Sequence, residues 1–419
     1  MGNQLVTSSL CRCGFCQVHA TSEKPIYQSK VNFYICENCA SGINNIFVKR
    51  KEKEGVTTPS KPKIDFKLDL KPKEIKSALD EHVIGQEGAK RILSVAIFNH
   101  FKRVNYKRKN PHDPEIKKSN ILLIGPTGCG KTLLAETIAK KFKIPFATAD
   151  ASMLTKAGYV GEDVQDMVYA LVANADWDIE AAQKGIIYVD EVDKLAKGPK
   201  EYVGIDIGEV AVQQALLKII ESAKIPIKIK TSRGVETKEV DTSNILFIFG
   251  GAFVGMEKII QERREKKEIG FGARINNKTS QLLNEIQVKD LKKYGLIPEF
   301  IGRIPVVAVL KELSEEDLVQ VLVKPRDALA KQYIKLFEMD DIKLTFSRQA
   351  LEEIAKKAIA SGSGARGTRQ ILEDVMKNIM FEAPSVNGLK QITLTAKSVL
   401  NGIPDYIFSE ENVKISMRA

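Results

Sequence analysis

Residues 125–132 read Gly-Pro-Thr-Gly-Cys-Gly-Lys-Thr, directly after the apolar run Ile121–Ile124 and before residues that favour a helix. Glycines let backbone N–H groups close around a phosphate, and the amino end of the next helix adds a positive dipole. A strand, a turn of this kind and a helix together form a P-loop. We therefore predict that nucleotide is bound by Gly125, Pro126, Thr127, Gly128, Cys129, Gly130, Lys131 and Thr132.

Three of these side chains have distinct expected roles. Lys131 can reach the β- and γ-phosphates, and the hydroxyl of Thr132 can ligate Mg²⁺. Cys129 is interpreted as a small residue that fills the loop, with a redox role as the alternative.

A second apolar run, Ile186-Ile-Tyr-Val, ends in the acids Asp190 and Glu191. A carboxylate at the carboxyl end of a strand can hold Mg²⁺, which is the role predicted for Asp190. Glu191 can polarise the attacking water as a general base. The pair predicts that the protein hydrolyses ATP rather than only binding it.

The fold class follows from three continuous apolar runs, at 121–124, 186–189 and 245–249, with helical periodicity between them. Continuous rather than alternating runs are typical of a parallel sheet covered by helices on both faces. We therefore predict a doubly wound α/β domain. After Leu310 the pattern changes to helices that follow Ser314, Ser347 and Gly367, with a minor strand near 391–395. This predicts a smaller, mostly helical C-terminal domain.

The 419 residues exceed one ordinary core, and we predict domains at 1–48, 76–310 and 311–419, with a flexible linker at 49–75. The net charge of +11 is compatible with a nucleic-acid partner. Much of the excess positive charge, however, lies in the linker, where we interpret it as solvated charge. No apolar run approaches the roughly 20 residues that span a bilayer, and no targeting signal is visible. The expectation is a cytoplasmic protein without a membrane contact.

Five of the six cysteines lie within the first 39 residues. Two pairs with two residues between their members, Cys13 with Cys16 and Cys36 with Cys39, fit a four-thiolate Zn²⁺ site. Cys11 and His19 are spare candidate ligands. So small a module has little core of its own, and the metal would supply its stability.

Several longer segments are more specific than the P-loop. They are Gly-Tyr-Val-Gly-Glu-Asp at 158–163, Val-Asp-Glu-Val-Asp-Lys at 189–194, Val-Gln-Gln-Ala-Leu-Leu-Lys at 212–218, Pro-Glu-Phe-Ile-Gly-Arg at 298–303 and Gly-Ala-Arg-Gly at 364–367. With the cysteine pairs, they closely resemble the ClpX family of AAA+ proteins, in the family's order and over nearly the whole chain.

The resemblance implies a homohexameric ring that uses ATP, Mg²⁺ and Zn²⁺ to unfold tagged or misfolded proteins and pass them to the ClpP protease, with adaptor proteins as further partners. Arg303 stands at the arginine-finger position, which acts on the neighbouring subunit's γ-phosphate. Arg366 stands at the sensor-2 position and touches the nucleotide. The segment Val83-Ile84-Gly85-Gln86 matches the one along the adenine base, with Val83 and Ile84 as its apolar pair.

Two further segments take their roles from the resemblance. The substrate-gripping pore loop is expected at Gly158, Tyr159, Val160 and Gly161, and the ClpP-docking tripeptide at Ile269, Gly270 and Phe271. One departure concerns tag choice: the family's Arg-Lys-His loop corresponds to residues 225–239, which offer Lys228, Lys230 and Arg233 but no histidine.

Three other functions compete with this one. A free-standing remodelling chaperone is disfavoured by the tripeptide at 269–271. A nucleic-acid ATPase with a zinc knuckle is disfavoured by Tyr159, because DNA-translocating relatives usually present basic residues in the pore. A scaffold without hydrolysis is disfavoured because Lys131, Asp190, Glu191, Arg303 and Arg366 are all present.

Overall fold

The chain, here a computed structural model, divides into two compact units, Met1–Asp65 and Phe66–Ala419, and each is described by itself. The described residues are 4–6, 12–19, 26–28, 34–41, 71–109, 116–155, 162–196, 207–231, 234–265, 282–402 and 404–408. Within them, none of the helices combines the length and the apolar character that crossing a bilayer requires.

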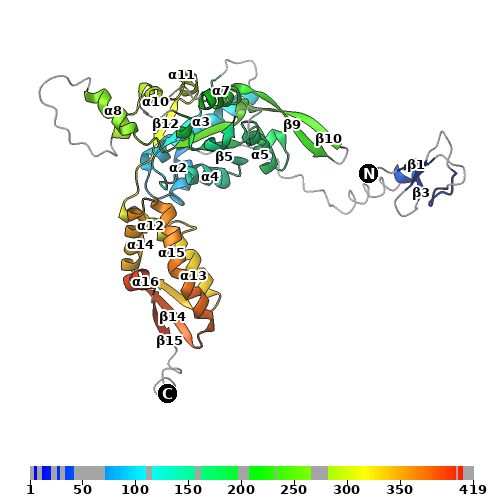
Figure 1. The fold of residues 1–419 in the computed structure, drawn as a ribbon. Helices are drawn as coiled ribbons and strands as arrows, with labels where there is room; N and C mark the ends of the chain where they lie inside the picture. Colours follow the sequence, from blue (N-terminus) through cyan, green and yellow to red (C-terminus); the bar gives the residue numbers. More distant parts are fainter. Residues whose placement is uncertain are drawn as a thin grey trace. The chain divides into compact units, whose positions relative to one another are not determined.

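A five-stranded parallel sheet forms the centre of the larger unit (Figure 1). Its order is β12 (Val306–Val309), β4 (Ile121–Ile124), β11 (Leu246–Gly251), β8 (Ile186–Asp190) and β5 (Phe146–Asp150). All neighbouring pairs are parallel, and every residue of β4 and β11 is buried. The predicted parallel sheet is confirmed, although β11 begins one residue later than the apolar run.

Both faces of this sheet are covered by helices. Leu122 and Ile124 of β4 belong to the apolar core on one face, and Ile121 and Leu123 to the core on the other. The first core includes residues of α5 (Asp166–Asn174), α7 (Ile207–Ser222), α8 (Met256–Glu265), α10 (Val288–Tyr294) and α11 (Pro298–Gly302). The second includes residues of α2 (Pro72–Asp80), α3 (Glu87–Lys109) and α4 (Lys131–Lys141). This confirms the doubly wound arrangement.

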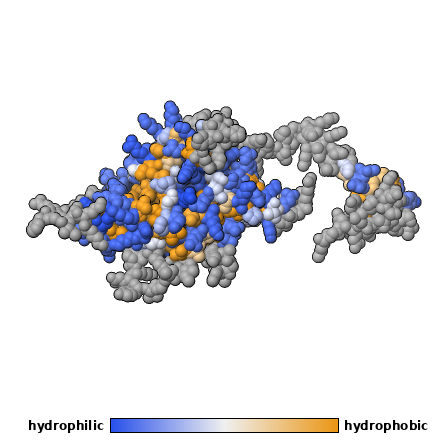
Figure 2. All heavy atoms as spheres, turned by 90° about the horizontal axis from the view of Figure 1, so that it is seen from above, coloured by the Kyte–Doolittle hydropathy of each residue, from blue (hydrophilic) through white to orange (hydrophobic). Residues whose placement is uncertain are grey.

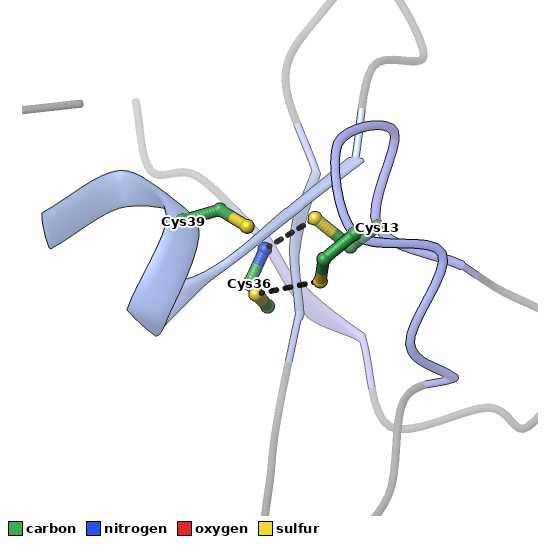
Figure 3. A group of neighbouring side chains, drawn as sticks. Cys13, Cys36 and Cys39 are labelled. Carbon is green, nitrogen blue, oxygen red and sulfur yellow. Dashed lines mark hydrogen bonds between the residues drawn. The ribbon is translucent and has the colours of Figure 1, made fainter. Parts of the chain in front are cut away.

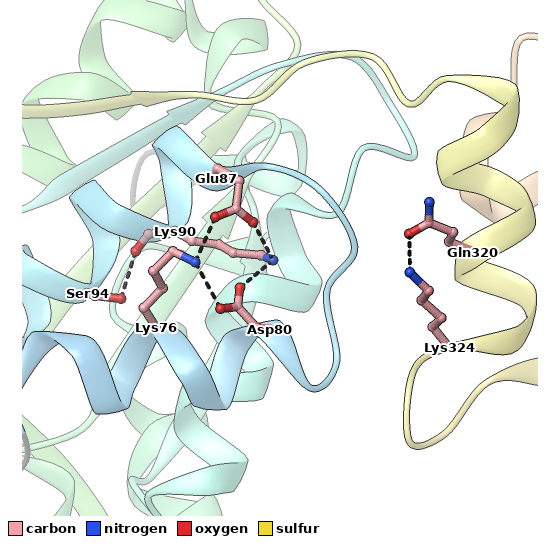
Figure 4. Close-up of polar contacts among 7 residues, drawn as sticks. All are labelled: Lys76, Asp80, Glu87, Lys90, Ser94, Gln320 and Lys324. Atoms are coloured by element: carbon pink, nitrogen blue, oxygen red, sulfur yellow. Dashed lines mark hydrogen bonds and ion pairs between the residues drawn. The ribbon is translucent and has the colours of Figure 1, made fainter.

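Ion pairs connect helix α2 to helix α3 (Figure 4). The ammonium of Lys90, only 2% exposed, lies 2.7 Å from a carboxylate oxygen of Asp80. Lys76 pairs with Asp80 at 2.9 Å and with Glu87 at 2.7 Å. Burial raises the pKa of Asp80, but the hydrogen bonds from Lys90 and Lys76 outweigh it and hold that pKa below its usual value. Helix α2 begins at Pro72, four residues before the domain start at 76 expected from the sequence.

The stretch 225–239, which corresponds to the family's basic loop, lies within a hairpin. Strands β9 (Lys224–Thr231) and β10 (Gly234–Asp241) pair antiparallel over their whole length. On β9 the side chains of Ile225, Ile227 and Ile229 are buried, and Lys228 between them is exposed. This alternation orients one face of the hairpin toward the apolar core and leaves the basic residue in solvent.

The shorter elements of this part are η1 (Ala151–Met153), β6 (Leu154–Thr155), β7 (Glu162–Asp163), α6 (Ile179–Ala182), η2 (Val192–Leu195), η3 (Thr242–Asn244) and η4 (Leu283–Glu285).

The C-terminal part has its own apolar core. Its elements are α12 (Glu315–Val323), α13 (Leu329–Glu338), β13 (Lys343–Phe346), α14 (Arg348–Ala360), α15 (Gly364–Glu382), η5 (Ala383–Ser385), β14 (Leu389–Leu394), α16 (Ala396–Asn401) and β15 (Asp405–Phe408). The mostly helical domain is confirmed. The minor strand is β14, which pairs with β13 and β15.

The predicted helix starts in this domain can be checked one by one. The hydroxyls of Ser314 and Ser347 accept hydrogen bonds from backbone N–H groups three residues later, as helix caps do. Helix α15, however, begins at Gly364 and not after Gly367, so that start was wrong. The left-handed φ of Gly362 (65°) and Gly364 (56°) completes the turn early, and a helix can resume at once.

In the smaller unit, β1 (Gln4–Val6), β2 (Ile26–Gln28) and β3 (Tyr34–Cys36) form an antiparallel sheet in that order. Residues 37–41 continue from β3 as a helical turn. The core around this sheet holds Cys13, Ile26 and Cys36. Two of the three are candidate metal ligands, so a bound metal would contribute much of the packing of this unit.

Candidate active site and metal centre

The P-loop joins the carboxyl end of β4 to the amino end of α4. Gly128 and Gly130 have φ of 76° and 99°, a conformation that other residues adopt only with strain. Gly128 also lies so close to the turn after α14 that a Cβ there would be 2.5 Å from the carbonyl oxygen of Ser363. The buried ammonium of Lys131 donates to the carbonyl oxygens of Gly125 (2.6 Å) and Pro126 (2.9 Å). These bonds hold its charge inside the loop.

Asp190 meets the P-loop at the carboxyl edge of the sheet. The hydroxyl of Thr132 donates to its Oδ2 at 3.1 Å. Its Oδ1 accepts from the hydroxyl of Tyr188 at 3.2 Å and from the backbone N–H of Glu191 at 2.9 Å. A carboxylate and a hydroxyl in contact are oxygen ligands of the kind that Mg²⁺ prefers, so the residues present fit this ion.

Tyr188 is a site residue that the sequence reasoning missed. Its side chain is fully buried beneath the P-loop and contacts both Thr132 and Asp190. Burial, and then the charge of Asp190, raise its pKa far above the ordinary value, so the hydroxyl stays a neutral donor. A tyrosine within an otherwise aliphatic buried strand was the available signal, because buried tyrosine hydroxyls usually have a partner.

Glu191 has a strained backbone. Its φ of 54° and ψ of 31° place it in the left-handed region, directly after β8. For a residue other than glycine this costs on the order of 1–3 kcal/mol, and such strain concentrates at functional sites. The side chain is exposed beside Asp190, where it can reach water.

A cavity of about 350 Å³ adjoins the P-loop. Three segments line most of it: residues 126–129 of the loop, residues 310–313 of the connection to the C-terminal domain, and Ile359, Gly362 and Gly364 at the turn between α14 and α15. The N–H of Ala365 donates to the carbonyl of Gly128 at 3.3 Å. Arg366 follows, exposed in the first turn of α15. The C-terminal domain therefore contacts the phosphate loop directly.

The other predicted nucleotide residues lie around the same loop. Val83 is buried, and its Cγ1 is 4.0 Å from where a Cβ on Gly130 would stand. Ile84 is half-buried. Cys129 is buried, and burial raises the pKa of its thiol, which agrees with a packing role.

Gln86, the last residue of the segment expected along the adenine base, makes contacts that the sequence did not predict. Its side-chain amide donates to the carbonyl of Lys311 at 2.7 Å and accepts from the N–H of Lys311 at 2.9 Å. The same NH₂ group lies 3.4 Å from the carbonyl of Cys129. One side chain thus joins the start of α3, the P-loop and the connection to the C-terminal domain. No local pattern indicates a bond across 225 residues.

Arg303 is not part of the cluster in its own chain. It precedes β12, whose residues Val306 to Val309 pair in parallel with Ile121 to Ile124. The P-loop follows the carboxyl end of β4, and Arg303 stands at the amino end of the neighbouring strand. The four residues of β4 separate these edges by about 13 Å. Its Nε is 2.7 Å from a carboxylate oxygen of Glu221, and the side chain is 50% exposed.

The four cysteines of the smaller unit converge, and Figure 3 labels Cys13, Cys36 and Cys39 among them. The sulfur atoms of Cys13, Cys16, Cys36 and Cys39 all lie within 4.8 Å of one another. Those of a tetrahedral Zn–S₄ group are about 3.8 Å apart, given Zn–S bonds of about 2.3 Å. The residues present therefore fit a zinc ion.

Two thiols of this cluster have shifted pKa values in opposite directions: hydrogen bonds with Cys16 and Cys36 raise the pKa of Cys39 to about 12. Burial raises the pKa of Cys13, but backbone N–H groups of Cys16, Cys36 and Phe15 outweigh it and lower that pKa to about 6. The N–H of Cys36 lies 3.4 Å from the Cys13 sulfur. His19 does not belong to the cluster, and Cys11 lies outside the described residues.

Comparison with known proteins identifies the family. Two family models match: the AAA domain (Cdc48 subfamily) over residues 116–307, and the C-terminal, D2-small domain, of ClpB protein over residues 313–395. The ATP-dependent Clp protease ATP-binding subunit ClpX of Treponema denticola is 43% identical over 405 residues, which cover 93% of this chain and 94% of that relative. The chain belongs to the ClpX family.

Further ClpX proteins support this. Those of Borrelia duttonii and Borrelia recurrentis are each 43% identical over 396 residues, which cover 93% of this chain and 91% of theirs. The chain is accordingly an AAA+ ATPase with an ATP-binding domain, a small C-terminal domain and an N-terminal four-cysteine cluster. Residues 158–161 and 269–271, with their expected roles in a ClpX protein, lie outside the described residues.

Proposed function

We propose that the chain is an ATP-driven protein unfoldase that assembles as a homohexameric ring and passes its substrates to the ClpP protease. The single observation that carries the ring is the place of Arg303 at the edge of the sheet opposite the P-loop. A finger there reaches ATP only across a subunit interface, and repeating one such heterologous interface closes a ring. Membership of the ClpX family carries the rest.

In each ring site we assign the chemistry as follows. Lys131 binds the β- and γ-phosphates, Thr132 and Asp190 hold Mg²⁺, and Glu191 orients and deprotonates the attacking water. The hydrogen bonds to Asp190 from the hydroxyl of Thr132 and from the backbone N–H of Glu191 support these roles. Arg303 of the next subunit completes the site.

Nucleotide would also link the two domains. The cavity beside the P-loop is of the size of small-molecule sites and is bordered by both domains. We assign Arg366 to the phosphates and Val83 and Ile84 to the adenine base. When hydrolysis changes the charge beside Gly128, the contact with Ala365 is the direct route by which the C-terminal domain would respond.

Some apolar side chains of the larger unit are exposed. Orange apolar areas interrupt the polar surface seen from above (Figure 2). Val254, which lines the cavity, is 78% exposed, and Val288 at the start of α10 is 67% exposed. Single exposed side chains of this kind are common on protein surfaces, so the ring rests on the place of Arg303.

The substrate and partner contacts rest on the sequence. Tyr159, between Gly158 and Val160, would grip unfolded chains, because aromatic surface binds polypeptide without demanding a sequence. Tagged or misfolded proteins and adaptors are the proposed partners, in the cytoplasm, with no role for nucleic acid. The domain boundaries near 48, 75 and 310 remain predictions.

Zinc in the four-cysteine cluster has its own test. Freshly purified protein should contain about one zinc per chain, and Cys36→Ser should lose it together with the fold of the smaller unit. ATP turnover should change less than about twofold, because the ATPase lies in the other unit. Metal analysis measures the zinc content, and circular dichroism measures the fold of the smaller unit. Cys129→Ser is the control for the zinc content, which should be unchanged. A zinc content near zero in the unchanged protein would rule out the site.

Docking to ClpP is tested by deleting residues 269–271. A stable fluorescent protein with a degradation tag reports unfolding as lost fluorescence and degradation as released peptides. The deletion should leave ATP-dependent unfolding intact and stop degradation by added ClpP, since only the apolar contact to the protease is removed. Continued degradation would show that this tripeptide is not the docking contact, and the free-standing chaperone would gain support.

A further inference from the structure

The backbone of Arg303 is held by a buried side chain that stands 183 residues earlier in the chain. Asn120, only 1% exposed, donates from its Nδ2 to the carbonyl oxygen of Arg303 at 2.8 Å. Asn120 is the last residue before β4, whose other end leads into the P-loop. Asn120, which precedes the strand that leads into the P-loop, therefore contacts Arg303, the residue proposed to complete the ATP site of the neighbouring subunit.

The same amide binds a second strand. Its Oδ1 accepts from the N–H of Phe247, in β11, at 3.4 Å. Because β4 lies between β12 and β11, Asn120 connects the amino ends of three adjacent strands. Both ends of the amide are used, so its orientation is fixed.

The rest of Arg303 is fixed less firmly. Its N–H donates to the carbonyl oxygen of Phe300 in α11, and the next residue, Ile304, is buried. Beyond the backbone, the half-exposed guanidinium has an ion pair with Glu221, itself 40% exposed. Exposed ion pairs contribute little and exchange readily. The side chain can thus leave Glu221 for a phosphate, while its backbone stays where Asn120 holds it.

We propose that Asn120 is a positioning residue for hydrolysis: its amide sets the place from which Arg303 reaches the neighbouring subunit's ATP. This rests on the proposed ring, in which Arg303 acts across the interface. A misplacement of about 1 Å can cost about 10²-fold in rate, so a single lost anchor is enough to matter.

Two substitutions remove the anchor in different ways. Asn120→Asp keeps the size and loses the donor, and Asn120→Ala loses the whole amide. In full-length rings we expect kcat for ATP hydrolysis to fall about tenfold or more, with KM changed less than about twofold, because the finger acts on the transition state. Asn174→Ala is the matched control, since Asn174 donates to a carbonyl at the amino end of β5, at the far edge of the sheet.

A general structural role is separated by a double-mutant cycle. In an Arg303→Ala background, Asn120→Ala should lower kcat no further, because there is no finger left to position. A purely structural residue would lower kcat by the same factor in both backgrounds. Equal factors, or a normal kcat for Asn120→Ala alone, would overturn the proposal.

Rings assembled from two different variants provide a second test, which does not depend on comparing the stability of single variants. Subunits with Asn120→Ala should regain turnover when mixed with Glu191→Gln subunits, because each contributes the half-site that the other lacks. No gain on mixing would overturn the proposal. If Arg303→Ala itself leaves kcat unchanged, the proposed ring site fails instead, and the two failures are thereby distinguished.

Discussion

Glu191→Gln is expected to bind ATP normally and to hydrolyse it at least ~10²-fold more slowly, the usual scale for loss of a general base. The substitution keeps the size and polarity of the side chain and removes the group that accepts a proton. It leaves the bonds of Asp190 to Thr132 and Tyr188 in place, so the proposed Mg²⁺ site survives. Steady-state hydrolysis and equilibrium binding of ATP, measured on one preparation, give both quantities.

Glu180→Gln is the matched control, since Glu180 is an exposed glutamate paired with Lys184 at 3.0 Å on the outside of the domain. Its turnover should equal that of the unchanged chain. Near-normal turnover in Glu191→Gln would remove Glu191 from the role of base. Loss of ATP binding in the same variant would assign it to binding instead.

Arg303→Ala is expected to lower kcat by about 10³-fold, the lower end of the range for an arginine finger. The loss should appear although Arg303 lies about 13 Å from its own P-loop edge. Arg369→Ala serves as control, because Arg369 is an exposed arginine paired with Glu373 at 2.8 Å in the C-terminal domain.

Mixing shows whether the finger acts in its own or the next subunit. In equal mixtures of Arg303→Ala and Glu191→Gln chains, about one interface in four combines an intact Glu191 with an intact Arg303. Turnover should therefore rise well above that of either variant alone. If the mixture is no more active than the average of its components, Arg303 does not act across the interface.

Much of the fold could be predicted because its signals are local. Strands β4, β8 and β11 are short continuous apolar runs, as is typical of a parallel sheet buried on both faces. The serine caps of α12 and α14 act within three residues. The hairpin of β9 and β10 was missed, although the isoleucines of β9 alternate with polar residues as in a half-buried strand, because β9 contains Pro226 and β10 is mostly polar.

In the candidate site, too, residues in local motifs could be predicted and residues with distant partners could not. Lys131, Thr132, Asp190 and Glu191 were found because the P-loop and the acidic strand end are compact motifs. The contacts of Gln86 and Asn120 were missed because their partners are distant in sequence, as with Asn120 and Arg303. Tyr188 was missed although Asp190 is two residues away, because its contact with Thr132 appears only when the P-loop lies over β8. The order of β12 and β4 places Arg303 opposite the P-loop, and topology of that kind has no signature in either segment.

The central claim is that ATP hydrolysis by this chain unfolds proteins. Its most direct test is the fluorescence of a stable, tagged fluorescent protein incubated with the purified chain and no protease, in the presence of a trap that prevents refolding. The account predicts that fluorescence falls with ATP and stays constant with a non-hydrolysable analogue or with the Glu191→Gln variant. Constant fluorescence during active ATP hydrolysis, with several different tags, would contradict it.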